Sequence, residues 1–269
     1  MPRCGVEGLL LVWTGSWPLP VGAMTYSTVN TPSEVFVVLD APKAPMIPAW
    51  VSVLRLSCSW ASGATDDSTA ARKVTNALHL WGDYNGGVPA FTNSVTDASE
   101  NFYLRRCVES FVTSGVVGQC SDFADLLLCL QTSLGLNRRA VQRTHPLDSA
   151  ARESQLPNGN TGLLLGFQTH VIDAARYGAS QYDGSPTWSY HQFCTDSRDQ
   201  VVWDACLQFR LSHRVAVNAM PREPDYRDHL VKTYYFLDQL NGLIVSIDDP
   251  ASFWRPTPTG GFIPNATAN

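Results

Sequence analysis

One stretch of this chain constrains its fold and its chemistry more than any other: a cysteine placed at the start of an apolar helix. Residues 118–135 begin Gly-Gln-Cys and then repeat apolar residues at spacings of three and four, at Phe123, Ala124, Leu127, Leu130 and Leu134. This spacing predicts a core helix that ends at Gly135. Cys120 would lie in the first turn, where unpaired N–H groups and the helix dipole favour a thiolate.

Cys120 alone does not establish a nucleophile, because a cysteine in an apolar helix is more often a small buried hydrophobe. Two downstream segments, residues 188–193 and 201–205, add a histidine and an aspartate on consecutive predicted strands. If the two strands form a hairpin with His191 opposite Asp204, the turn is centred between Ser197 and Arg198. The carboxylate would then orient the imidazole, which could deprotonate a thiol.

Each of these two residues also has a structural explanation. His191 could be a core histidine with a local partner, and Asp204 could cap a turn. The catalytic interpretation is favoured because three residue types agree in order, element and register. His170 is an alternative base. Asp122 and Asp125 could raise the pKa of the thiol, touch substrate or belong to a solvated helix face.

Composition narrows the function classes. The chain has 269 residues, 44% of them hydrophobic and 16% charged, which predicts a globular fold. A formal charge of -5 without basic runs argues against nucleic acid and anionic membranes as partners. No apolar run is long enough for a membrane span. We therefore expect a cytoplasmic protein, with signal-independent export as an alternative.

Metal and disulfide frameworks lack support in the sequence. Seven cysteines are an odd number with irregular spacing, which favours reduced thiols. No Cys-x-x-Cys or His-x-x-x-His pair suggests a zinc site, and no acidic cluster has the spacing of a calcium loop. We expect neither a metal nor a cofactor, although calcium ligands from distant segments would not be visible in the sequence.

The order of predicted elements indicates the fold class. Residues 1–47 show short β-type runs between Pro, Gly, Ser and Thr, and predict an N-terminal β-rich region. Residues 48–135 then show helical periodicity, and residues 136–209 return to strand patterns. Helices followed by strands predict an α+β domain with a mainly antiparallel sheet, over residues 48–269.

The motifs together resemble one enzyme family. Gly118-Gln119-Cys120-x-x-Phe123-Ala124, then Leu134-Gly135-Leu136-x-x-Arg139-x-Val141, a His strand and a Trp-Asp strand are similar to the transglutaminase-like superfamily of papain-type thiol enzymes. The likeness covers roughly residues 78–210. It implies a transglutaminase-like core and a Cys120–His191–Asp204 triad. It also implies an oxyanion donor upstream, with Trp81 as the first candidate and Tyr84 or Gln119 as weaker ones.

The resemblance implies a protein or peptide substrate with an amide, either a glutamine side chain or a peptide bond. A thioester on Cys120 could lead to peptide cleavage, glutamine deamidation or transfer to an amine, and the sequence does not separate these outcomes. The family also contains members without catalysis. A binding or scaffold module with an inactive site is therefore the competing hypothesis.

Overall fold

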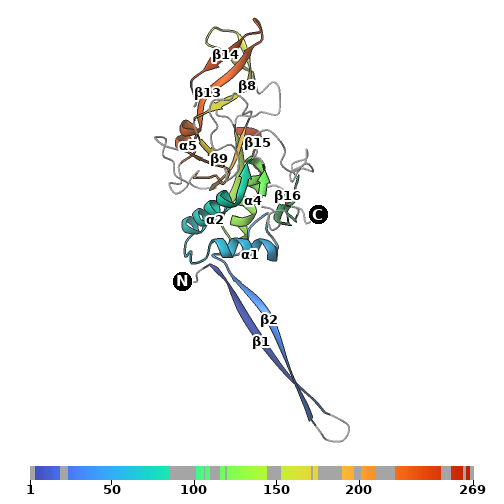
Figure 1. Cartoon of the computed structure of the whole chain (residues 1–269). Helices are drawn as coiled ribbons and strands as arrows, with labels where there is room; N and C mark the ends of the chain where they lie inside the picture. Colours follow the sequence, from blue (N-terminus) through green and yellow to red (C-terminus); the bar gives the residue numbers. More distant parts are fainter. Residues whose placement is uncertain are drawn as a thin grey trace.

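A computed structural model of the chain combines helices with mainly antiparallel strands, which confirms the predicted α+β class (Figure 1). The described residues are 4–18, 24–84, 101–105, 107–109, 116–118, 120–143, 153–170, 172–174, 190–196, 201–209, 222–249, 256–262 and 265–266. The principal helices are α1 (Val51–Trp60), α2 (Asp67–Trp81), α4 (Cys120–Ser133) and α5 (Glu223–Leu230). Within the described residues, no helix has the length and apolar character that a bilayer span requires.

Helix α4 is the centre of the core. All but one of its residues are buried, because α1, α2 and strands of the neighbouring sheet surround it. The predicted start at Cys120 is confirmed, and the helix ends just before Gly135, as expected. Gly135 has φ +87°, and an added Cβ would lie 2.4 Å from the Asp40 carbonyl oxygen. Only glycine fits this turn without strain.

Helices α1 and α2 pack on α4. Asp66 caps the start of α2, since its carboxylate accepts a hydrogen bond from the Thr69 N–H at 2.8 Å. Helix α1 buries Val53 and Ser57, whereas Val51 is exposed. Ser57 can lie inside because its hydroxyl donates to the Val53 carbonyl and accepts from Ser133.

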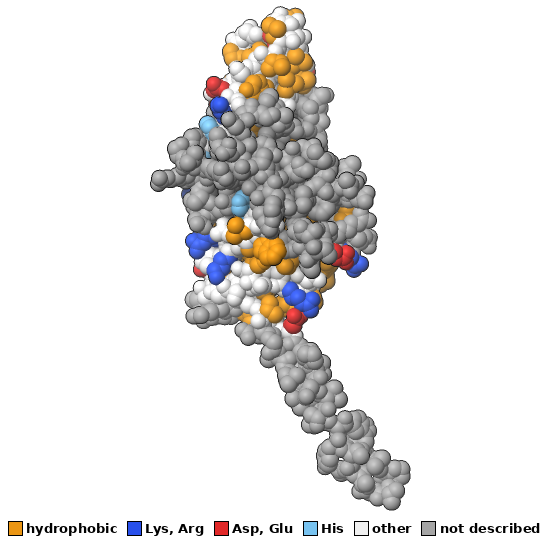
Figure 2. Space-filling model, in the orientation of Figure 1, with side chains coloured by type: hydrophobic (Ala, Val, Ile, Leu, Met, Phe, Trp, Pro, Cys, Tyr) orange, Lys and Arg blue, Asp and Glu red, His pale blue; other side chains and the backbone are white. Residues whose placement is uncertain are grey.

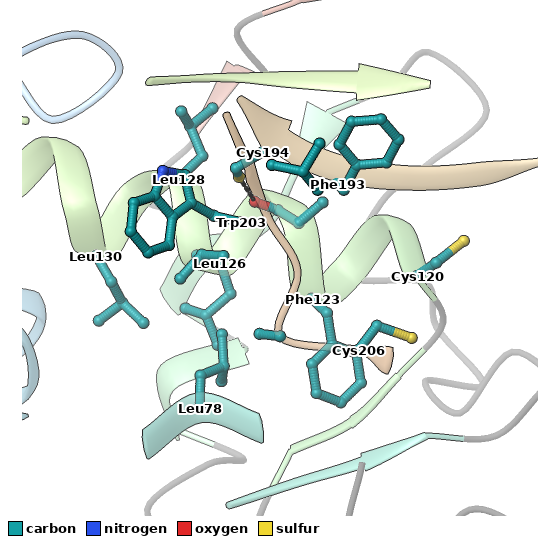
Figure 3. Packing of buried hydrophobic residues seen from close by; sticks show 14 of the residues in the cluster. Leu78, Cys120, Phe123, Leu126, Leu128, Leu130, Phe193, Cys194, Trp203 and Cys206 are labelled. Carbon is teal, nitrogen blue, oxygen red and sulfur yellow. Dashed lines mark hydrogen bonds between the residues drawn. The ribbon is translucent and has the colours of Figure 1, made fainter. Parts of the chain in front are cut away.

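A four-stranded antiparallel sheet covers α4. Its order is β11 (Val202–Trp203), β10 (His191–Asp196), β6 (Arg138–Arg143) and β15 (Pro256–Phe262). Strand β10 contacts α4 directly, and both contribute apolar side chains to the core (Figure 3). Besides the N-terminal hairpin, the described residues form three two-stranded pairs: β12 (Leu207–Phe209) with β9 (Ile172–Ala174), β3 (Gly82–Tyr84) with β5 (Val116–Gly118), and β4 (Asn101–Phe102) with β16 (Asn265–Ala266).

A second four-stranded antiparallel sheet forms the far end of the molecule. Its order is β14 (Ile244–Ile247), β13 (Val231–Asp238), β8 (Thr161–Thr169) and β7 (Glu153–Gln155). Hydrophobic side chains are visible on the surface of this end (Figure 2), and Leu165, Leu240, Leu243 and Ile244 are exposed. We call this sheet the distal sheet.

The N-terminal region is a long hairpin that extends away from the helices (Figure 1). Strands β1 (Gly5–Pro18) and β2 (Met24–Val37) pair antiparallel along their whole lengths. Both strands contact α1. The structure therefore contains strands where the sequence suggests a β-rich region, and the boundary at residue 47 stays a prediction.

Candidate active site

Cys120 lies at the first position of α4, at its N-terminal end (Figure 3). Its exposed fraction is 5%, the largest among the seven cysteines, all of which are free thiols. The backbone N–H groups of a first helical turn have no carbonyl partner within the helix, and the dipole places partial positive charge there. Negative charge on this sulfur, or on an oxygen beside it, is therefore stabilised.

His191 opens strand β10 and is fully buried. Its Nε2–H donates to the Oδ2 atom of Asp204 at 2.8 Å, and the Cys120 side chain interacts electrostatically with the ring. Because Asp204 holds Nε2, Nδ1 is the nitrogen left for the thiol. The structure thus brings together the three side chains that the sequence predicts as a triad.

The carboxylate of Asp204 is fixed on both oxygens. Oδ1 accepts the N–H groups of Cys206 at 2.7 Å and Leu207 at 3.2 Å. Oδ2 accepts the hydroxyl of Tyr226 at 2.5 Å in addition to His191. Four donors leave the carboxylate one orientation, and that orientation aligns the imidazole.

The predicted hairpin register is wrong by two residues. Cys194 pairs with Trp203 and Thr195 with Val202, whereas His191 pairs with Arg143 on the other neighbouring strand. Strand β11 ends before Asp204 because this side chain binds the N–H groups two and three residues ahead, which turns the chain out of the ladder. The Asp204 side chain nevertheless reaches the ring.

The electrostatics of the pair favour an imidazolium beside a carboxylate. Burial lowers the pKa of His191, but the charge of Asp204 and its hydrogen bond, with smaller contributions from Cys120, raise the pKa to about 9. Burial by itself raises the pKa of Asp204. The charge of His191, its hydrogen bond and the other donors outweigh burial, so the pKa of Asp204 lies below its usual range. The charged forms of His191 and Asp204 therefore stabilise each other.

A hydrogen bond beside His191 ties its strand to the cysteine helix. The next residue, Gln192, donates from Nε2 to Asp125 Oδ1 on α4 at 2.7 Å. Cys194 donates from Sγ to the Ala124 carbonyl at 3.0 Å. All of the side chains that make these contacts are buried, so the spacing between the beginnings of α4 and β10 is held by direct contacts.

The same contacts correct one interpretation of the acidic residues near the thiol. Asp122 and Asp125 are both buried, so they do not form a solvated helix face. Asp125 positions Gln192, and both carboxylates raise the pKa of the neighbouring Cys107 thiol, after the larger effect of burial. Contact of Asp122 with substrate stays a prediction.

The pairing of strands β3 and β5 shows where the oxyanion candidates Trp81 and Tyr84 lie relative to Cys120. These strands run parallel, with Gly82 opposite Val116 and Tyr84 opposite Gly118. Trp81 therefore precedes the pair at the end opposite Cys120, and 49% of it is exposed. The register places the Tyr84 backbone closer, and Gln119 lies outside the described residues.

The alternative base His170 lies at the end of strand β8, where its N–H donates to the Leu230 carbonyl at 3.0 Å. The histidine whose pKa the Cys120 side chain affects is His191. Among the described residues, no group of three or more His, Cys, Asp or Glu side chains is arranged to hold a metal ion.

The other six cysteines differ from Cys120 in environment. Burial raises the pKa of Cys58 to about 11, raises that of Cys4, and raises those of Cys107, Cys129, Cys194 and Cys206 well above the usual thiol value. Thiols of this kind are poor nucleophiles at neutral pH.

Tyr226 is the site residue that sequence reasoning missed. It lies on α5, outside the part of the chain that resembles the family, and 22 residues separate it from Asp204. The short segment Glu-Pro-Asp-Tyr-Arg-Asp-His-Leu has strong polar character and carries no catalytic motif. Its one available signal was the proline near the start of a short helix.

Comparisons with known proteins do not identify a family. No protein-family model and no curated protein matches the sequence. One solved structure with similarity is that of a candidate cysteine protease from Cytophaga hutchinsonii, with 13% sequence identity and a TM-score of 0.28 over 93% of this chain and 73% of that chain. The transglutaminase-like core therefore stays a prediction.

Proposed function

We propose that this protein is a thiol enzyme that attacks amide carbonyls through a thioester on Cys120. The observation that carries the proposal is the set of Cys120, His191 and Asp204, in which a hydrogen bond of 2.8 Å joins His191 to Asp204 and the Cys120 side chain interacts electrostatically with the imidazole. The set is buried and its helix N-terminus favours an anion, which supports catalysis rather than packing as its role.

The proton path follows from these contacts. His191 accepts the thiol proton, and the Cys120 sulfur attacks the amide carbon to form a tetrahedral adduct. Its C–N bond then breaks as His191 returns the proton to the leaving nitrogen, which departs as ammonia or an amine. Water then cleaves the thioester to a carboxylic acid, or a primary amine replaces water and forms a new amide.

The developing oxyanion requires donors near the thiol. The first turn of α4 supplies the Cys120 backbone N–H and the positive end of the helix dipole. A second donor would come from the residues beside strand β5. The Tyr84 backbone is level with Gly118 in the β3 and β5 register, so Tyr84 is favoured over Trp81.

We expect the substrate to be a protein or peptide with a glutamine side chain or an accessible peptide bond. Mass spectrometry after incubation with such substrates, with and without a primary amine, separates the three reactions. Deamidation adds about one mass unit, cleavage yields fragments, and transfer joins the amine with loss of ammonia.

The matched variant is Cys120→Ser, which changes one atom of a buried side chain. We expect it to fold and to lose turnover in every assay. Persistent turnover in Cys120→Ser would contradict the proposal, as would a wild-type protein that changes no amide substrate in a panel that covers both bond types.

A further inference from the structure

We propose that Tyr226 is a positioning residue of the thiol centre: its hydroxyl fixes the Asp204 carboxylate, and its ring covers the His191 imidazole. The inference rests on the proposed function and extends it to helix α5. The catalytic unit then includes residues 223–230, beyond the segment that carries the triad.

The hydroxyl contact is specific to one oxygen atom. Tyr226 Oη donates to Asp204 Oδ2 at 2.5 Å, and this same atom accepts from His191 Nε2 at 2.8 Å. The same carboxylate oxygen thus accepts from a neutral hydroxyl and from an imidazole that can carry a positive charge. A tyrosine that served packing alone could place its hydroxyl against any backbone carbonyl of the core.

The ring contact reinforces the same interaction. The rings of Tyr226 and His191 are stacked, with centroids 6.3 Å apart and an interplanar angle of 18°. Phe193 completes the cover, with its centroid 5.1 Å from Tyr226 and 6.0 Å from His191. Tyr226 has an exposed fraction of 2%, so its ring excludes water from the His191 and Asp204 bond. A dry environment strengthens this bond.

Helix α5 holds Tyr226 in this place. The Tyr226 N–H donates to the Arg222 carbonyl at 2.9 Å, and the helix continues directly into strand β13 of the distal sheet. The hydroxyl therefore approaches Asp204 from an element separate from α4, β10 and the bend after β11. Each member of the site is supported by its own segment of the fold.

Removal of the Tyr226 hydroxyl should change the proton affinity of His191 in a predictable direction. Without that donor, Asp204 relies more on His191 for its hydrogen bonds, so the imidazole holds its proton more tightly. The other ionisable side chains that interact with Tyr226 or with this pair are Cys120 on α4, Cys194 on β10 and Cys206 in the bend, and Asp122 on α4 interacts with Cys206. A substitution at 226 leaves all of them in place.

The experiment compares Tyr226→Phe with Tyr235→Phe. Tyr235 is a matched control because its hydroxyl also donates to a side-chain oxygen, that of Gln168 at 2.9 Å, but in the distal sheet. For each protein, ring nitrogen NMR would follow the protonation of His191 with pH, peptide mass spectrometry would follow alkylation of Cys120, and calorimetry would follow unfolding.

We expect the His191 titration in Tyr226→Phe to move upward by about one pH unit. Turnover should fall by about tenfold, because the imidazole is less well oriented. Tyr235→Phe should keep the wild-type titration. A third protein with 3-fluorotyrosine at 226, a stronger donor, should shift the titration downward, and it tests the proposal even if Tyr226→Phe does not fold.

The outcomes separate the two proposals. If the alkylation rate of wild-type Cys120 does not follow the protonation of His191 as the pH changes, the proposed function fails. If that dependence is present but the titration of Tyr226→Phe or of the fluorotyrosine protein superimposes on that of wild type, Tyr226 is a core residue and only this inference is overturned.

Discussion

Two buried carboxylates at different ends of the molecule are built in the same way. Asp204 lies beside the thiol, and Asp238 ends strand β13 in the distal sheet, with exposed fractions of 8% and 1%. Each accepts several hydrogen bonds on both oxygens. Asp238 accepts from the side chains of Asn158, Asn160 and Asn241 and from the N–H groups of Leu240 and Asn241.

The difference lies in the donors. Every donor to Asp238 is a neutral amide. Together these hydrogen bonds join the turn before β8 to the turn after β13 and stabilise the distal sheet. Its pKa is lowered to about 2, mainly by the hydrogen bond from Asn160. Asp204 instead shares an oxygen with an imidazole that contacts a thiol. Only the second arrangement can move a proton to and from a nucleophile.

The largest expected effect is a loss of turnover in Asp204→Asn. An amide in place of the carboxylate removes the charge that stabilises the imidazolium, and can favour the wrong tautomer, so turnover should fall by about 10³ to 10⁴. Steady-state kinetics on the amide substrate measure this. Asp238→Asn is the control, and equal losses in the two variants would remove the distinction between the carboxylates.

The second expected effect is a difference in how the stability contributed by the His191–Asp204 pair and by Asp238 depends on pH. The His191 pKa is raised from 6.5 to about 9, so its contribution to stability is complete below about pH 6.5 and is lost as the pH rises through 9. The Asp238 pKa is lowered, so its contribution is complete above about pH 4 and is lost as the pH falls through 2.

Turnover should therefore decline on the alkaline side near pH 9, where the imidazolium loses the proton needed for the leaving nitrogen. Urea unfolding across the same range should show stability falling between pH 6.5 and 9 by up to about 3 kcal/mol, and His191→Asn should remove this slope. If stability still declines with rising pH in His191→Asn, the decline comes from another group and the role given to His191 is contradicted.

A smaller effect is expected where the cysteine helix meets the histidine strand. Gln192→Leu removes the donor to Asp125 at 2.7 Å, and the variant should lose about 2 kcal/mol of unfolding free energy. Turnover should fall several-fold because the position of Cys120 relative to His191 is less well fixed. Gln192→Glu is a further variant, which places a like charge against Asp125 and should have a larger effect on both quantities.

The smallest effect on turnover is expected from Asp238→Ala. The variant leaves the donors of Asn158, Asn160 and Asn241 without their shared acceptor, so the thermal midpoint should fall by about 5 °C. Turnover at a temperature where the protein is folded should stay at the wild-type value. A strong loss of turnover would mean that the distal sheet positions the site more closely than we infer.

The sequence predicted the local features of the site better than its long-range ones. The helix that begins at Cys120 and its end at Gly135 depend on nearby residues, and the structure contains both. The hairpin register was wrong because strand arithmetic does not anticipate the turn that Asp204 makes with the next N–H groups. Tyr226 was missed because its contact depends on the path of the chain through a different element.

The central claim is that Cys120 is an activated thiol, and its reactivity tests this most directly. Iodoacetamide labelling at pH 6.5, with each cysteine quantified by peptide mass spectrometry, compares it with the six buried thiols in one experiment. We predict that Cys120 reacts far faster than the others and that His191→Ala abolishes the difference. Labelling of Cys120 at the rate of the other cysteines, or at the same rate without the imidazole, would contradict the account.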